Sequence, residues 1–293
     1  MSEAADEPGQ GERVKSAARV LDLVEAVAAH EAGLTFPALL QLSRIPKSSL
    51  HALLGVLTAR GWLDLDEATR LYTLGVKVWE NGQAYRKGRD LVREARPVME
   101  SIAGAINETV QLAQLDGTEN VYLAKVDSTH PLRLQSEVGA RLSAHATGLG
   151  KAMLACLGDD EVRRRLGRNA LPRMTPHTIV TADALIEELQ RVRFWGFAVD
   201  DQEYTPGLFC VAVPIRDQRG DAVAAVSVSV PLLRLEMKTL ATALARLAAG
   251  SLEIARRLGG NGDDPALVRL AEPAFALQAL VERGRGWSWT QKD

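Results

Sequence analysis

The sequence GLGK at residues 148–151 is the first place where residue types and spacing suggest a chemical function. A glycine-rich turn that ends in lysine holds nucleotide phosphates when another glycine stands five residues before the last one and Ser or Thr follows the lysine. Here His145 and Ala152 occupy those two positions. Because the magnesium-binding hydroxyl is missing, the segment predicts no nucleotide-binding loop.

Outside this segment, the side chains that could catalyse a reaction lack suitable partners. Cys210 lies within an apolar stretch, so we expect a buried, unreactive thiol. Asp200, Asp201 and Glu203 form an acidic cluster, but nothing in the sequence positions a partner carboxylate, and a polar loop is the favoured interpretation. No Gly-x-Ser-x-Gly elbow occurs, and the histidines and cysteines show no metal-ligand spacing. The sequence therefore predicts no enzyme, no metal site and no cofactor.

A basic and hydroxyl-bearing set, Lys47, Ser48 and Ser49, stands where a short helix is predicted to begin at Pro46. Hydroxyls and free N–H groups at a helix N-terminus suit phosphate oxygens, and the lysine adds positive charge. The same helix has a core face of leucines and an opposite face of small residues: Leu50, Leu53, Leu54 and Leu57 against Ser48, Ala52, Gly55 and Ala59. A small outer face lets a helix enter the major groove of DNA, which is about 12 Å wide. A solvent-exposed face, or one that packs on a partner, is the alternative interpretation.

The elements predicted around these residues are short helices followed by a hairpin. An amphipathic stripe predicts a helix over 14–30, and Pro37 suits the first turn of a second helix that runs to Ser43. Alternating residues at 62–65 and 71–74 predict a hairpin after the third helix. This order is typical of a winged helix-turn-helix, in which the hairpin is the wing.

The rest of the chain predicts a second, mixed domain. Residues 76–106 read as helical, with Pro97 marking a boundary or kink. From residue 109 the period changes to two, and hairpins mixed with helices indicate an α+β domain with an antiparallel sheet. The predicted elements are strands at 109–115, 120–126, 132–138, 208–216 and 222–230 and helices at 148–167, 182–195 and 235–258. After a glycine-rich break, an extra helix is expected over 265–283, interrupted by Pro273.

The strands at 208–216 and 222–230 each have one face of large branched residues and one face of small or faintly polar residues. If they pair through their short turn, Cys210 on the small face lies near Ser227. Such a face leaves room for a bound molecule, oriented by thiol and hydroxyl groups, or for a closely packed helix. The pattern alone favours neither.

Composition limits the class of protein. The chain has 293 residues, 46% hydrophobic and 25% charged, with a net charge of −2, so any case for nucleic acid must rest on a local site. Two cysteines favour a reducing compartment, and the acidic, polar N-terminus is not typical of a signal peptide. No apolar run approaches the roughly 20 residues of a membrane span. We expect a cytoplasmic protein without a membrane partner.

Several separate motifs give the chain a family resemblance. VKSAARVLDLVEAVA and GLTFPALLQLSRIPKSSLHALLGVLTARGWL, then HATGLGKAMLA, GFAVDDQEYTPGLFCVAVPIRD and AVAAVSVSVP, resemble IclR-type bacterial transcriptional regulators in the same order, over about residues 14–258. The resemblance implies a ligand-responsive regulator that binds a palindromic operator in double-stranded DNA as a homodimer or a dimer of dimers (a homotetramer). It also implies a winged helix-turn-helix and an effector-binding domain of GAF-like type. The expected division is a disordered start at 1–13, a DNA-binding domain at 14–75, a linker helix at 76–96, an effector-binding domain at 97–258 and a tail at 259–293.

The resemblance also implies site residues. Effectors of this family are commonly small organic or aromatic acids, held by the loop at HATGLGK, the Asp before the EY motif, the Cys of the following strand and two Ser on the last strand. The matching positions here are Gly148, Leu149, Asp200, Cys210, Ser227 and Ser229, with Leu134, Leu142 and Leu208 as apolar walls. Backbone N–H groups at the start of a helix suit a carboxylate. The expected DNA-binding residues are Arg44, Lys47, Ser48, Ser49, His51, Thr58 and Arg60.

Two positions depart from the family pattern. Ala52 stands where these regulators usually have Arg, at the centre of the outer helix face, so one base or phosphate contact is missing. Arg44 stands where Gly is usual in the helix-turn, at a modest conformational cost, and is a candidate phosphate contact. Ala52 favours an alternative function, a small-molecule-binding or enzymatic domain whose helical module serves protein association. Lys47, the adjacent serines and the wing favour DNA.

Overall fold

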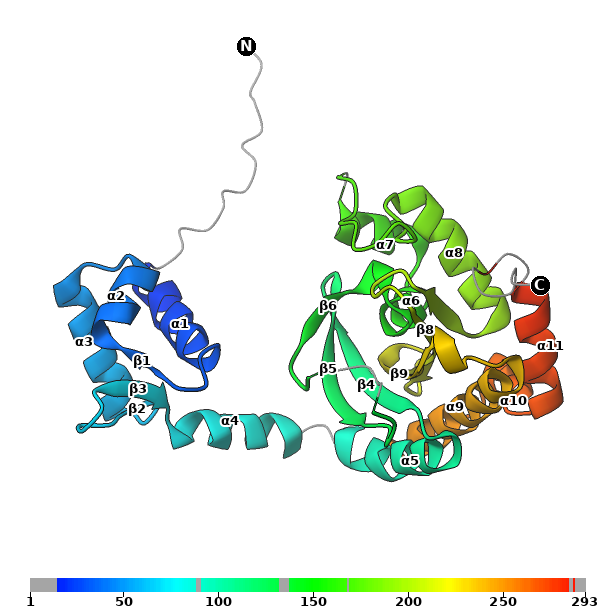
Figure 1. Ribbon diagram of the computed structural model, residues 1–293, viewed down its shortest axis with the longest axis horizontal. Coiled ribbons are helices and arrows are strands. Elements are labelled where there is room, and N and C mark those ends of the chain that lie inside the picture. Colours follow the sequence, from blue (N-terminus) through cyan, green and yellow to red (C-terminus); the bar gives the residue numbers. More distant parts are fainter. Residues whose placement is uncertain (1–14, 88–90, 132–136, 168, 285–286, 288–293) are drawn as a thin grey trace, which may run out of the picture. The chain divides into compact units, whose positions relative to one another are not determined.

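The computed structural model describes residues 15–87, 91–131, 137–167, 169–284 and 287, which form two compact units divided after residue 89 (Figure 1). The first unit contains α1 (Lys15–Ala28), β1 (Leu34–Thr35), α2 (Phe36–Ser43), α3 (Lys47–Ala59), β2 (Leu63–Leu65), β3 (Leu71–Leu74) and α4 (Val76–Lys87). Its strands form an antiparallel sheet in the order β1-β3-β2. The predicted winged helix-turn-helix is confirmed.

The core of the first unit follows from the helix stripes. Leucines at 23, 39, 50, 54, 57 and 63 are buried together, so the apolar faces of α1, α2 and α3 meet above the hairpin. Thr35 caps α2 by accepting a hydrogen bond from the Ala38 N–H at 3.4 Å. Arg44 ends α2 with φ 53°, in the left-handed region where the family usually has Gly.

The second unit is an α+β domain around a six-stranded antiparallel sheet in the order β6-β5-β4-β9-β8-β7. Its strands are β4 (Thr109–Asp116), β5 (Glu119–Val126), β6 (Arg141–Ser143), β7 (Ala198–Asp201), β8 (Leu208–Arg216) and β9 (Ala222–Pro231). Its α-helices are α5 (Leu91–Ile106), α6 (Gly148–Leu154), α7 (Asp159–Leu166), α8 (Ala182–Trp195), α9 (Met237–Arg257), α10 (Pro265–Leu270) and α11 (Pro273–Arg283).

The two faces of this sheet carry different cores. Branched and aromatic residues of β8 and β9, such as Phe209 and Val228, pack against α5, α9, α10 and α11. The small residues Ala212 and Ala225 face α6 and α8. The predicted bulky and small faces are therefore confirmed, and both explanations of the small face hold: a helix packs on part of it, and a cavity opens beside that helix.

Several predicted elements need correction. The helix predicted over 148–167 is two helices, because α7 begins afresh after its N-cap Gly158. Pro97 is not a boundary; it lies inside α5. Residues 132–136 of the strand predicted over 132–138 lie outside the described residues, and the strand that pairs with β5 there is β6. The extra helix is interrupted by Pro273 as predicted, which gives α10 and α11.

Candidate functional site

A cavity of about 410 Å³ opens on the small-residue face of the second unit's sheet. The start of α6, the strands β7 to β9 and the strands β4 to β6 each contribute to its wall. The lining residues are Gln111, Tyr122, Glu137, Ala140, Arg141, Leu142, Thr147, Gly148, Leu149, Asp200, Tyr204, Thr205, Leu208, Cys210 and Ser227. A wall of this kind, apolar with a few converging polar groups, is typical of small-molecule sites.

Most of the expected effector-binding positions meet in this wall, namely Leu142, Gly148, Leu149, Asp200, Leu208, Cys210 and Ser227. Ser229 is not among the lining residues, but its hydroxyl lies 2.9 Å from both the Cys210 thiol and the Gln111 side-chain oxygen. Leu134 lies outside the described residues. The structure thus brings together expected residues from three separate stretches of the sequence, 142–149, 200–210 and 227–229.

The register between β8 and β9 corrects one expected neighbour. Cys210 lies opposite Ser229, and Ser227 lies opposite Ala212. A register shift between Ile215 and Arg216 moves the ladder near the turn. The Cys210 thiol is buried as predicted, and burial raises its pKa, so it remains a neutral thiol.

Two lining residues from β4 and β5 were not anticipated from the sequence. Gln111 pairs across the ladder with Ser227, which places its amide on the cavity face. Tyr122 is also largely buried on this face, and burial raises the pKa of its phenol, which therefore stays protonated. The available signal was the amide of Gln111 between the apolar residues Val110 and Leu112, because a polar group stays buried in a strand only where it has a hydrogen-bond partner.

Glycines let α6 lie close to the sheet, at Gly148, and to the turn that precedes the helix, at Gly150. A side-chain carbon added at Gly148 would lie 3.4 Å from the Ala212 Cβ, and one at Gly150 would lie 2.2 Å from the Ala144 carbonyl oxygen. Thr147 caps the helix by accepting from the Gly150 N–H at 3.1 Å. The glycines of the GLGK sequence therefore have a packing function, and the first turn of α6 lies against the cavity.

Asp200 is the carboxyl group of the cavity wall whose pKa burial raises into the neutral range. One carboxyl oxygen accepts from the N–H groups of Glu203 at 2.6 Å and Tyr204 at 3.3 Å. Burial raises the pKa of Asp200 to about 7, and the neighbouring Glu203 charge adds to the rise. Near neutral pH the group is therefore divided between a carboxylate, which accepts hydrogen bonds, and a carboxylic acid, which also donates one.

The acidic cluster is not the polar loop that the sequence favoured. Asp200 is on β7, and both it and Glu203 are buried. Glu203 pairs with Lys151, whose side chain is 0% exposed. The Thr175 and Thr178 hydroxyls donate to the Glu203 carbonyl at 3.2 and 2.6 Å and hold the turn after β7. Lys151 is thus enclosed by protein partners, which gives a second reason against a phosphate loop.

In the first unit, the expected DNA-binding residues lie along α3 and the turn before it. Side chains of Arg44, Lys47, Ser48, His51 and Arg60 are exposed, whereas Ser49 and Thr58 are half-buried. The Thr58 hydroxyl donates to the Leu54 carbonyl at 2.9 Å, so part of its hydrogen-bonding capacity is used within the helix.

The outer face of α3 is open and small. Ala52, Gly55 and Ala59 are exposed, and a side-chain carbon added at Gly55 would meet nothing within 4 Å. The opposite face, with Leu50, Leu54 and Leu57, is buried, as the helical period predicts. This arrangement leaves a narrow helix surface with cationic and hydroxyl groups at its N-terminal end.

Among the described residues, no cluster of three or more His, Cys, Asp and Glu side chains fits a metal ion. No described helix is both long enough and apolar enough to cross a membrane.

Comparison with known protein families identifies the family to which each of the two units is similar. The family described as Bacterial transcriptional regulator IclR C-terminal matches residues 83–256, and the IclR helix-turn-helix domain matches residues 16–67. The regulator KdgR of Escherichia coli K12 is 32% identical over 256 residues, which cover 87% of this chain and 97% of KdgR. BhcR of Paracoccus denitrificans is 33% identical over 222 residues, or 76% of this chain and 79% of BhcR.

Solved structures show the same architecture. A transcriptional regulator from Rhodococcus sp. RHA1 superposes with a TM-score of 0.73 at 29% identity, covering 84% of this chain and 98% of that one. An IclR homologue from Microbacterium hydrocarbonoxydans, crystallised with 4-hydroxybenzoate, has a TM-score of 0.74 at 24% identity and covers 83% of this chain and 99% of its own.

Proposed function

Because the chain belongs to the IclR family of DNA-binding transcriptional regulators, we propose that a small organic or aromatic acid in its C-terminal cavity controls its binding to a palindromic operator. The observation that carries this proposal is the cavity, in which residues from five separate segments surround about 410 Å³. Sites for small molecules typically enclose about 300–1,000 Å³.

The chemistry of the wall suits an acid with an apolar body. Leu142, Leu149 and Leu208 supply apolar surface. The first N–H groups of a helix have no acceptor within the helix, so those of Gly148 and Leu149 at the start of α6 are donors for a carboxylate. Asp200 and Tyr122 add groups that exchange hydrogen bonds with a ligand hydroxyl or carboxyl. The same fold holds 4-hydroxybenzoate in the Microbacterium protein, which supports an aromatic acid as the first candidate.

We further propose that α3 enters the major groove, with Lys47 and Ser48 on phosphates and Arg44 on the adjoining backbone. Their exposure at the N-terminal end of α3 supports this assignment. Such modules bind two half-sites about one DNA turn apart when the protein is dimeric, so a dimer or a dimer of dimers accounts for a palindromic operator. We assign DNA binding to 14–75, the linker to α4, and ligand binding to the second unit, because the expected boundary between 96 and 97 would cut through α5. Since operators are chromosomal, the protein acts in the cytoplasm.

The test is calorimetric titration of the full chain with benzoate, 4-hydroxybenzoate and a set of aliphatic hydroxy and keto acids. Ser227→Leu fills the cavity and should abolish binding of any acid that the wild type binds. Ser101→Leu makes the same substitution on the exposed side of α5 and serves as the control. Equal affinity in wild type and Ser227→Leu would contradict a ligand site in this cavity.

A further inference from the structure

The last helix that the structure describes, α11, places a buried arginine inside the second unit. The Arg283 side chain on α11 is 3% exposed. It donates to the Phe197 carbonyl, forms an ion pair with Glu188 of α8, and places its guanidinium 4.7 Å from the centre of the Phe197 ring. A buried arginine is tolerated only where its N–H groups have acceptors and its charge has a counter-ion. Phe197 and Glu188 supply both for Arg283, so the contact is specific.

Phe197, which Arg283 contacts, lies immediately before the strand that contributes Asp200 to the cavity wall. Phe197 precedes β7, and Asp200 stands at the third position of that strand. β7 is one of the two edge strands of the sheet, and among the described residues only β8 pairs with it, through Ala198 with Ala212 and Asp200 with Cys210. An edge strand has one free side and depends on other contacts for a fixed position. Arg283 supplies such a contact at the point where β7 begins.

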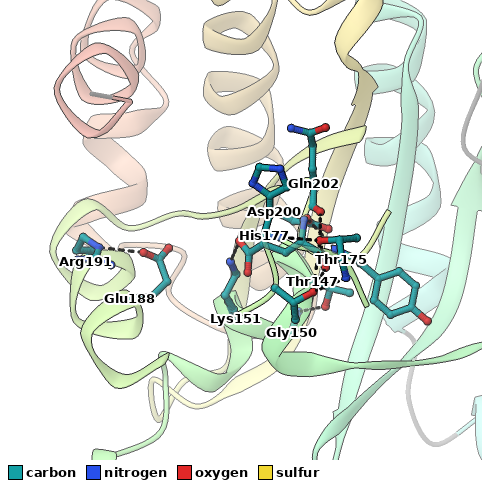
Figure 2. A network of polar contacts seen from close by, with 12 residues as sticks. Thr147, Gly150, Lys151, Thr175, His177, Glu188, Arg191, Asp200 and Gln202 are labelled. Carbon is teal, nitrogen blue, oxygen red and sulfur yellow. Dashed lines mark hydrogen bonds and ion pairs between the residues drawn. The ribbon is translucent and has the colours of Figure 1, made fainter. Parts of the chain in front are cut away.

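A series of buried charged side chains connects Arg283 of α11 with the turn that follows β7. Burial opposes ionisation of Glu188, but Arg283 and Lys151 together keep its pKa below the usual range. Lys151 in turn pairs with Glu203, whose N–H donates to the Asp200 carboxylate at 2.6 Å. Figure 2 shows Lys151 between Glu188 and the strand that carries Asp200. Arg283 therefore contacts the start of β7 directly and the turn after it through these charges.

We propose that Arg283 is a positioning residue for the ligand cavity, so that the C-terminal helix α11 sets the ligand affinity of the second unit. By fixing Phe197 and compensating Glu188, it holds β7 and Asp200 in the geometry that receives the ligand. The inference rests on the proposed function of the cavity. It extends that function to a part of the chain beyond residue 256, where the match to the family ends.

The test compares Arg283→Met with Arg191→Met in the full chain. Arg191 pairs with the same Glu188 carboxylate, at 2.9 Å, but is 57% exposed and lies on α8 itself, so it is the matched control. Amide hydrogen exchange is measured without ligand for residues 197–207, and the affinity for 4-hydroxybenzoate is measured by calorimetry. We expect exchange in Arg283→Met to be faster by about tenfold or more. The affinity should fall by about fivefold or more, within the usual range of coupling between sites. Arg191→Met should match the wild type in both.

The other possible results either overturn this inference or overturn the proposed function of the cavity. Wild-type exchange in Arg283→Met would overturn the inference, and so would equal effects of the two substitutions, because Arg283 would then act only through the charge of Glu188. If Arg283→Met does not fold, Arg283→Lys keeps the charge but not the guanidinium fork, and slow exchange in that variant would equally overturn it. If no acid binds the wild type, the proposed function of the cavity fails, while exchange over 197–207 still tests the positioning by Arg283.

Discussion

Replacing Asp200 with Asn isolates a titration that the structure places inside the cavity wall. Asn keeps the side-chain oxygen that accepts from the Glu203 and Tyr204 N–H groups, so the turn after β7 retains its hydrogen bonds. It removes the carboxyl whose pKa burial raises from 3.8 to about 7. The substitution therefore changes charge and titration with little change in shape.

The sign and size of the effect follow from linkage. Between pH 3.8 and about 7 the unfolded chain has lost the Asp200 proton while the folded chain keeps it, so wild-type stability falls as pH rises through this range. Each factor of ten in the ionisation constant is worth about 1.36 kcal/mol, so the ionised group costs the folded state on the order of 4 kcal/mol above pH 7. Asp200→Asn does not incur this cost. The difference between its free energy of unfolding and that of wild type should therefore increase with pH and then level off.

The assay is urea unfolding of both proteins from pH 4.5 to pH 8, with the second unit followed through hydrogen exchange in β8. We expect the free energy of unfolding of Asp200→Asn to gain on that of wild type by about 2–4 kcal/mol over this range. A difference that stays constant within about 0.5 kcal/mol, or one that shrinks as pH rises, would refute the reasoning that burial dominates at Asp200.

Three further substitutions test separate parts of the structure. Arg44→Gly should raise the free energy of urea unfolding of the first unit by about 1 kcal/mol, because Gly accepts the left-handed conformation at φ 53° without strain; no gain would show that Arg44 is unstrained there. Gly150→Ala should lower the melting temperature and weaken acid binding, since its Cβ would lie 2.2 Å from the Ala144 oxygen; an unchanged melting curve would contradict that close packing. Ser227→Leu should abolish the effect of the acid on DNA binding in a gel-shift titration while sparing DNA affinity; a normal response would place the effector elsewhere.

The pattern of apolar residues along a short stretch of sequence was sufficient to predict the elements whose apolar residues face a single core. The stripe of α1, the alternation of β8 and β9, and Pro273 at the start of α11 are each visible in a few neighbouring residues, and the structure has them there. The small-residue face of β8 and β9 was likewise readable from the sequence, since side chains alternate along a strand.

What the sequence could not predict depends on contacts between distant segments. Asp200 and Glu203 read as a polar loop because Lys151, about 50 residues earlier, is what makes burial of Glu203 tolerable. The pairing of Cys210 with Ser229 follows from a register shift near the turn, which no alternation pattern reveals. The sequence predicted no role for Arg283 beyond ending the extra helix, because its partners Phe197 and Glu188 come from other segments.

The most direct test of the account is titration of the full chain on DNA from upstream of its own gene and on an unrelated duplex, at several salt concentrations. Wild type is compared with Lys47→Ala, with and without an acid that calorimetry shows to bind. We expect wild type to prefer the native fragment, with the logarithm of affinity falling linearly with that of salt and the acid changing the affinity. Lys47→Ala should weaken binding to both duplexes and reduce the salt slope by about 1. Equal affinity for both duplexes, together with an unchanged slope in Lys47→Ala, would contradict DNA recognition through α3.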